Sequence, residues 1–176
     1  MAVVAVVLLV QGANRPADPE LSPAGTSSPS APSTSRQPLD GFEEIAFAIA
    51  AGDEAAAATS RCALLADESA SRQQGLTGQE DLRGYDAMVF RFPEPTEVGF
   101  TMRGTPQDLT VAFFDEEGAF VGSLDMAPCP EDAEGCPSYP PPEEYLHALE
   151  VAPGDLTRLG IQADARLAFP EGGCPG

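Results

Sequence analysis

The strongest constraint on the fold of this chain is a run of short apolar segments within residues 100–136. Leu109, Val111 and Phe113 alternate with other residues, and a second apolar segment follows the turn at 115–118, whose sequence is Asp-Glu-Glu-Gly. A period of two places alternate side chains on one face of a β-strand, and a tight polar turn between two such segments is typical of a hairpin. This part of the chain therefore predicts two antiparallel strands, which a close pair of cysteines follows.

Similar short apolar segments recur along the rest of the chain, with a turn signal about every ten residues. We expect a fold that is mostly β (α+β): a compact single-domain β barrel or sandwich with one or two short helices. We expect Asp67 to cap the first helix, and Pro93 and Pro95 to end the strand that begins at Met88. Outside residues 100–136, the expected strands are 42–47, 57–66, 88–92, 145–151 and 166–169, and the expected helices are 68–74 and 156–160.

Composition divides the chain into three parts. Residues 2–10 are uninterrupted apolar and too few to span a bilayer of ~30 Å, but they suit the core of a signal peptide, so residues 1–12 are predicted to be a signal peptide or membrane anchor. Residues 13–39 are rich in Pro, Ser, Thr and Ala and lack the apolar content that would repay ordering, which predicts a disordered Pro/Ser-rich linker. The folded domain is predicted to cover residues 40–176. We expect an extracytoplasmic protein, either secreted or tethered to the outer face of the cytoplasmic membrane.

The net charge argues against two classes of partner. The chain has 28 Asp and Glu against 9 basic residues, all of them Arg, and its net charge is −19. Such a surface repels phosphate backbones and anionic lipid, which argues against nucleic-acid binding and against membrane contact outside the N-terminal segment. We expect a monomer whose partner is an unknown small acidic ligand or an envelope protein.

An even number of cysteines beside an export signal favours disulfides. The four cysteines allow three pairings, and the pairing with the shortest loop joins Cys129 to Cys136 and Cys62 to Cys174. The sequence holds no Cys-x-x-Cys pair and a single histidine, His147, so we expect no metal site. No cofactor-binding motif occurs either, and we expect no cofactor.

Several short motifs follow one another in an order that identifies a family. These motifs are Arg72-Gln-Gln-Gly75-Leu76, Met88-Val-Phe90, Phe100-Thr-Met102-Arg103-Gly-Thr105, Met126-Ala-Pro128-Cys129 and Ala148-Leu-Glu150-Val. The ordered set covers roughly residues 57–169 and resembles the prokaryotic family called domain of unknown function 192. The resemblance implies a small, mostly β, secreted or membrane-tethered domain, and it implies no assigned reaction.

The chain departs from the family pattern at four positions. Thr77 stands where the pattern has Met, and Thr101 stands where it has an aromatic residue, usually Trp. Gly104 replaces an Asn, and Thr110 replaces an Asp. If the family used a carboxylate at that last position, Asp108 could replace it only imperfectly, although the period of two places it on the same strand face.

Six residues form the candidate ligand site. Arg72 and Arg103 could grip a carboxylate or a phosphate, because a guanidinium matches the geometry of both anions. The alternative is that each arginine pairs with Glu150 or with another of the many acids. Glu150 lies between Leu149 and Val151 and therefore faces the side opposite to those apolar residues. The remaining candidates are two hydroxyl contacts and one residue at the rim of the pocket: Thr105, Thr110 and Tyr139.

These features predict a non-catalytic binding or interaction module of the cell envelope. Two alternatives stay open, an envelope hydrolase or ligand-processing enzyme that uses Glu150 or Asp108, and a structural accessory domain. An enzyme should hold a carboxylate with a strongly raised pKa in a cleft. A binding module should hold a pocket whose arginines await an acidic ligand. A structural domain should have those arginines already paired with Glu150 and no cavity.

Overall fold

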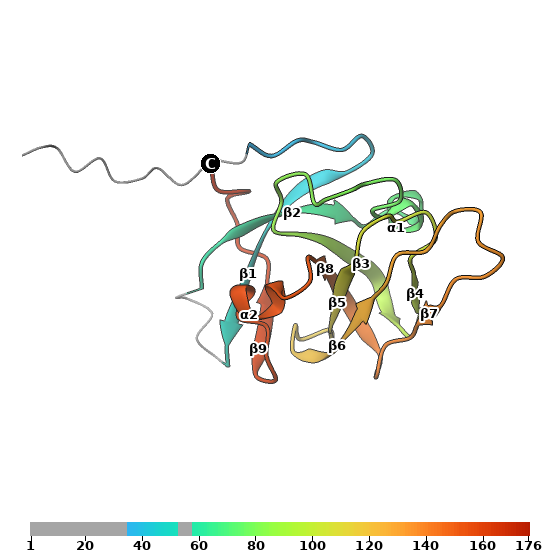
Figure 1. Ribbon diagram of the computed structural model, residues 1–176. Coiled ribbons are helices and arrows are strands. Elements are labelled where there is room, and N and C mark those ends of the chain that lie inside the picture. The colour runs from blue at the N-terminus through green and yellow to red at the C-terminus, as the bar shows by residue number, and fades with distance from the viewer. Residues whose placement is uncertain (1–34, 53–57) are drawn as a thin grey trace, which may run out of the picture. The chain divides into compact units, whose positions relative to one another are not determined.

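The computed structural model describes residues 35–52 and 58–176 (Figure 1). The predicted signal peptide or anchor at 1–12 and most of the predicted linker at 13–39 lie outside the described residues. Within the described ranges, no helix has the length and hydropathy needed to cross a membrane.

The described residues form nine strands and two short helices. The strands are β1 (Glu43–Ala51), β2 (Arg61–Ala66), β3 (Ala87–Thr96), β4 (Phe100–Thr101), β5 (Leu109–Phe114), β6 (Phe120–Met126), β7 (Ser138–Tyr139), β8 (Tyr145–Val151) and β9 (Ala165–Ala168), and the helices are α1 (Ser69–Gln74) and α2 (Asp155–Leu159). Seven strands pair in the order β6-β5-β8-β3-β2-β1-β9, all antiparallel except β2 with β3. The short strands β4 and β7 form a separate two-stranded sheet.

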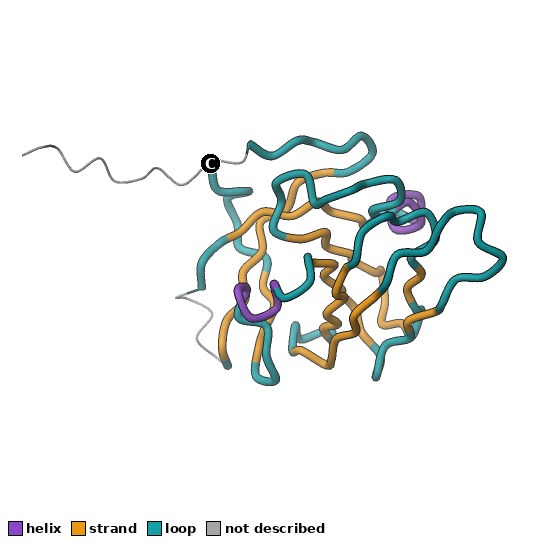
Figure 2. The backbone as a smooth tube through the Cα atoms, viewed as in Figure 1, coloured by secondary structure: helices purple, strands orange, loops and turns teal. Residues whose placement is uncertain are grey.

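The large sheet curls into a half-barrel whose two edges approach each other (Figures 1 and 2). The turn between β5 and β6 contacts β9, because the Leu167 amide donates to the Gly118 carbonyl at 2.8 Å and Ala119 bridges to Arg166. Gly118 has φ +76°, and a Cβ at this position would lie 2.3 Å from the Leu167 carbonyl oxygen. The predicted class, mostly β with barrel-like curvature and two short helices, is confirmed.

Each face of the sheet carries its own apolar core. The first core, called the pocket-side core because a pocket opens on its face of the sheet, contains Cys62, Leu64, Met88, Phe90, Leu109, Val111, Phe113, Tyr145 and Ala148. The α2-side core contains Phe47, Leu65, Val89, Ala112, Phe114, Leu149, Val151, Leu159 and Leu167. The predicted alternation of β5 is therefore confirmed, since its odd and even positions from Val111 to Phe114 fall in different cores. Each large side chain buried in this way contributes about 1.5–3 kcal/mol to folding.

Two local predictions were wrong. The strand that begins at Ala87 does not end at Pro93 or Pro95 but continues to Thr96. Its pairing with β8 is interrupted between Arg91 and Thr96, so the prolines stand where the ladder demands no amide donor.

The first helix was predicted to be capped by Asp67, but its N-cap is Glu68. The Ser71 hydroxyl accepts from the Glu68 amide at 3.1 Å and donates to the Glu68 carbonyl at 3.0 Å. Ser71, in the first turn, thus bonds the main chain of the N-cap residue, and the helix begins one residue later than the sequence pattern predicted.

Two disulfides join Cys62 to Cys174 and Cys129 to Cys136. This is the pairing with the shortest loop. The first bond ties β2 to the C-terminal segment across 112 residues, and the second closes a loop between cysteines seven residues apart.

Candidate functional site

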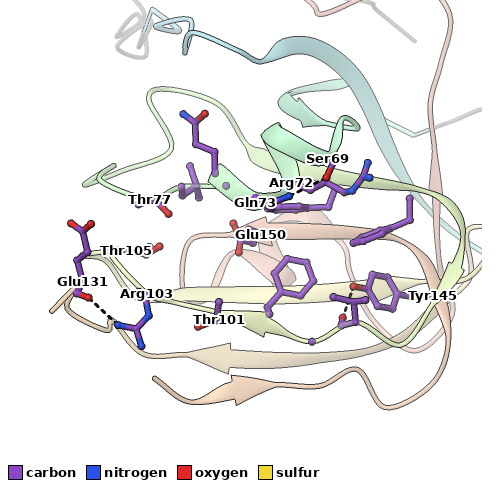
Figure 3. Close-up of a pocket in the computed structure, with 18 residues that line it drawn as sticks. Ser69, Arg72, Gln73, Thr77, Thr101, Arg103, Thr105, Glu131, Tyr145 and Glu150 are labelled. Atoms are coloured by element: carbon purple, nitrogen blue, oxygen red, sulfur yellow. Dashed lines mark hydrogen bonds between the residues drawn. The ribbon is translucent and has the colours of Figure 1, made fainter. Parts of the chain in front are cut away.

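A pocket of about 560 Å³ opens on the face of the sheet that carries the pocket-side core (Figure 3). Its walls come from α1 and the turn after it, from β3, β4 and β8, from the segment that follows β4, and from the loop between Cys129 and Cys136. Its lining includes Arg72, Arg103, Thr105 and Glu150, four of the six residues predicted for the ligand site.

Glu150 is the buried acid of this pocket. Its neighbours Leu149 and Val151 belong to the α2-side core, so alternation along β8 directs Glu150 to the opposite face, as predicted. In the sheet it lies between Met88 of β3 and Val111 of β5. Two apolar neighbours in register therefore flank the carboxyl group within its own sheet.

The Glu150 carboxyl has no partner in the described part of the chain. The residue is 5% exposed, and Oε2 is buried without a hydrogen bond. Burial disfavours the ionised form and raises the pKa of Glu150 from 4.5 to about 8. At neutral pH the group is therefore mostly a carboxylic acid, which can donate a hydrogen bond as well as accept one.

Arg72 reaches the pocket from α1. Its Nη1 donates to the carbonyls of Asp67 and, at 3.0 Å, of Arg91. Its guanidinium carbon lies over the ring of Phe92, 5.1 Å from the centroid. These contacts orient the side chain without neutralising it, because carbonyls and a ring face carry no net charge.

Arg103 reaches the pocket from the segment after β4. Its Nη1 donates at 2.9 Å to the carbonyls of both Glu131 and Ala133, within the loop that the Cys129–Cys136 disulfide closes. The closed loop therefore holds Arg103 in place. None of the ion pairs in the described ranges involves Arg103 or Arg72.

The two ends of the pocket differ in character. In Figure 3, Glu150 lies between an end that holds Arg103, Thr105 and Glu131 and an end that holds Tyr145. Thr77 and Thr101 add hydroxyl groups to the polar lining.

The aromatic part of the lining is built by packed rings. The centroids of Phe92 and Tyr145 are 5.2 Å apart, and those of Phe90 and Phe100 are 4.9 Å apart. The Tyr145 hydroxyl donates to the Val98 carbonyl at 2.7 Å, which fixes the ring. This lining is rigid and apolar, since its one phenol is already hydrogen-bonded.

Three residues singled out in the sequence lie elsewhere. The Thr110 hydroxyl donates to Asp125 Oδ1 at 2.7 Å and does not line the pocket. The Tyr139 hydroxyl accepts from the Ala127 amide at 3.0 Å. Tyr139 and Asp108 line a second hollow together with Asp125.

Several lining residues were not among the predicted site residues, although the sequence held a signal for two of them. Thr77 and Thr101 are positions at which the chain departs from the family pattern, and both line the pocket. Gly104, a third such position, has φ +72°, and a Cβ there would lie 3.0 Å from Thr77 Cγ2. Alternation places Phe90 and Phe92 on one face of β3, but it does not separate a core face from a pocket wall.

One cluster within the described ranges has the proximity expected of metal ligands. It consists of Glu44, Cys62 and Cys174, whose candidate ligand atoms lie within 4.8 Å of one another. The two sulfur atoms form a disulfide, so neither is available as a thiolate ligand.

Comparison with known proteins identifies the family. Residues 50–169 match the family DUF192, described as "Uncharacterized ACR". Since the match covers more than half of the chain, the protein belongs to the domain of unknown function 192 family. The resemblance drawn from the motifs is thereby confirmed.

Solved structures with the same fold include two bacterial proteins. A protein of unknown function from Novosphingobium aromaticivorans DSM 12444 has a TM-score of 0.62 and 21% identity, over 77% of this chain and 91% of that one. A Sinorhizobium meliloti 1021 protein, provisionally assigned as a transcription regulator, has a TM-score of 0.58 and 21% identity, over 73% of this chain and 95% of that one. At this identity the likeness establishes the fold alone. No curated protein matches the chain.

Proposed function

We propose that this member of the family is a binding module and that its pocket takes a small ligand with an acidic group. The observation that carries the proposal is the state of Arg72 and Arg103. Both line the pocket, and neither pairs with a described carboxylate, although the chain has 28 acidic residues. In the same ranges Arg36, Arg61 and Arg158 pair with acids, whereas Arg83 and Arg91 form no ion pair and lie outside the pocket.

Retention of both positive charges fits recognition of an anion. Main-chain carbonyls occupy Nη1 of Arg103, while its remaining N–H groups have no bond to a described residue. Charge-assisted bonds between a guanidinium and a carboxylate or phosphate are about twice as strong as neutral ones. A structural accessory domain would instead have these arginines paired with Glu150, and no such pair occurs in the described ranges.

The test is the thermal stability of the full chain in a panel of small carboxylates and phosphates. A ligand at about 100 times its Kd should add about 2.7 kcal/mol to the free energy of unfolding. Arg103→Gln should abolish the shift, and Arg36→Gln is the matched control, because Arg36 lies outside the pocket in a half-exposed ion pair. The proposal would be refuted if no carboxylate or phosphate raised the unfolding temperature of the unmodified chain. It would also be refuted if Arg103→Gln left the shift in unfolding temperature unchanged.

A second candidate function is catalysis by Glu150. A buried carboxyl with a raised pKa in a pocket has the properties of a general acid near neutral pH. Asp108, the other acid considered for this role, lines the second hollow instead. Turnover of nitrophenyl ester or glycoside reporters by the full chain, lost in Glu150→Gln and kept in Asp108→Asn, would establish the enzyme. Turnover kept in a folded Glu150→Gln variant would exclude this mechanism.

We also propose an extracytoplasmic location. The described residues form two disulfides, Cys62–Cys174 and Cys129–Cys136. Disulfides are typical of proteins that fold in oxidising compartments. Whether the chain is secreted or tethered is tested by fractionation of the source cells and protease treatment of intact cells. Recovery from the cytosol with four free thiols would refute the location.

A further inference from the structure

We infer that the ligand of this pocket is an amphipathic organic acid, with its acidic group at Arg103, an apolar body about the size of one ring against the aromatic lining, and a hydrogen-bond acceptor at Glu150 between them. The inference rests on the proposed function and names the class of ligand. It is argued from the size of the pocket, from the lining, and from the unpartnered acid.

The size of the pocket argues against a bare anion. A volume of about 560 Å³ is in the range of pockets that enclose drug-sized organic ligands. Inorganic phosphate or acetate would contact Arg103 and the neighbouring hydroxyls but would leave the aromatic lining in contact with water. The lining thus has a polar part, in which Arg103 and Thr105 lie beside the Glu131 side chain, and an apolar part for which a bare anion has no use.

The aromatic lining fits a ring. Phe90 packs edge to face with Phe100, and Phe92 with Tyr145, while the rings of Phe100 and Tyr145 are tilted against each other at 6.4 Å. The Tyr145 hydroxyl is already bonded to the Val98 carbonyl. A ligand ring can therefore gain apolar and edge-to-face contact there without breaking a hydrogen bond. The guanidinium of Arg72 also lies over the Phe92 ring and extends the aromatic surface.

Glu150 supplies the third contact. Buried polar groups nearly always have a hydrogen-bond partner, because leaving one unpaired costs free energy. Glu150 is 5% exposed, lacks a partner among the described residues, and lines the pocket (Figure 3). A carbonyl or ether oxygen of the ligand would give the Glu150 carboxyl the hydrogen-bond partner that it lacks. A neutral acceptor can take the hydrogen bond that the protonated Glu150 carboxyl donates. A carboxylate of the ligand at the same point would be repelled whenever Glu150 ionises.

The inference is tested with four compounds that separate its three parts. N-acetyl-L-phenylalanine carries the acid, the carbonyl and the ring. N-acetylglycine lacks the ring, 3-phenylpropionate lacks the amide carbonyl, and N-acetyl-L-phenylalaninamide lacks the negative charge. Titration calorimetry on the full chain should show that the first compound binds at least about tenfold more tightly than each of the other three, as expected for loss of one contact of about 1.4 kcal/mol.

A variant isolates the contact with Glu150. In Glu150→Leu, which keeps the bulk of the side chain and removes the donor, the affinity for N-acetyl-L-phenylalanine should fall to that for 3-phenylpropionate. The affinity for 3-phenylpropionate should stay unchanged. This comparison is a double-mutant cycle across the interface, so it reports the contact rather than a general effect of the substitution.

The outcomes distinguish the inference from the proposed function. If N-acetylglycine binds as tightly as N-acetyl-L-phenylalanine, an acid site exists but the amphipathic class is wrong. If Glu150→Leu weakens both ring-bearing acids equally, the assigned contact with Glu150 is wrong. If the uncharged amide binds as tightly as the acid, Arg103 is not an anion site and the proposed function fails as well.

Discussion

Replacing Glu150 by Gln should stabilise the fold, and the gain should grow with pH. The folded chain holds this carboxyl 5% exposed and without a described partner, and burial raises its pKa to about 8. In the unfolded chain the same group ionises near 4.5, its ordinary value. Between these two values the unfolded state has released the proton and the folded state has not. The free energy of unfolding therefore falls as the pH rises, and the loss ends above the folded pKa.

The magnitude follows from the two pKa values. Each pH unit between them removes about 1.4 kcal/mol, because a pKa difference of one unit corresponds to that free energy. The loss is near zero at pH 4.5, about 3 kcal/mol at pH 7 and about 5 kcal/mol above pH 8. Gln has nearly the same shape and does not ionise. The stability of the variant relative to the unmodified chain should therefore grow by these amounts between pH 4.5 and the pH in question.

Urea unfolding with both disulfides intact measures the difference. With a slope of about 2 kcal/mol per M, a gain of 3 kcal/mol at pH 7 shifts the midpoint by about 1.5 M. Glu134→Gln is the matched control, because it removes one negative charge at an exposed site in the Cys129–Cys136 loop. Its effect should stay within about 0.5 kcal/mol at every pH.

A constant difference between Glu150→Gln and the unmodified chain from pH 4.5 to pH 8.5 would refute the reasoning. It would mean that water or a neighbouring charge solvates the carboxyl as well in the folded chain as in the unfolded one. The proposed hydrogen bond from Glu150 to a ligand acceptor would then lose its physical basis.

Two further substitutions test the frame of the pocket. Gly118→Ala should lower the free energy of unfolding by more than about 2 kcal/mol, because a Cβ would lie 2.3 Å from the Leu167 carbonyl oxygen at φ +76°, and thermal unfolding measures the loss; unchanged stability would show that the two sheet edges do not meet there. Tyr145→Phe removes the 2.7 Å bond to the Val98 carbonyl and should cost about 1–2 kcal/mol, measured by urea unfolding; a neutral result would show that the carbonyl is satisfied by water.

The sequence was sufficient to predict most strands of the large sheet and their alternation, although the short strand β7 was not predicted and β3 was ended too early. Period-two alternation is a local property, so it predicted that Glu150 faces away from Leu149 and Val151. In the structure Glu150 lines the pocket, and Leu149 and Val151 belong to the α2-side core. The same rule, applied to β5, excludes Thr110 from the pocket. Val111 belongs to the pocket-side core, so the residue before it faces the other way. Which face of the sheet carries the pocket is a property of the folded structure, so the sequence alone did not exclude this candidate.

The composition of the pocket could not be predicted in the same way. It depends on α1, on the segment after β4 and on the Cys129–Cys136 loop meeting above one face of the sheet, and these contacts span distant parts of the chain. Pro93 and Pro95 were misread for a related reason. Whether a strand tolerates proline depends on where the neighbouring strand pairs with it, and that neighbour, β8, begins at Tyr145, far along the chain.

The two disulfides should separate stability from binding. Removing Cys62–Cys174 with a pair of alanines should cost about 5 kcal/mol, because the bond closes a long loop of the unfolded chain, and it should leave affinity for a small carboxylate unchanged in the folded protein. Removing Cys129–Cys136 should cost only about 2 kcal/mol.

The short loop nevertheless carries the two carbonyls that hold Arg103. Its opening should therefore lower the affinity for N-acetyl-L-phenylalanine about tenfold, measured by titration calorimetry at a temperature where both variants are folded. If the affinity falls equally in both disulfide variants, loosening of the whole domain explains it. If it falls in neither, Arg103 keeps its orientation without the loop, and the closed loop serves stability alone.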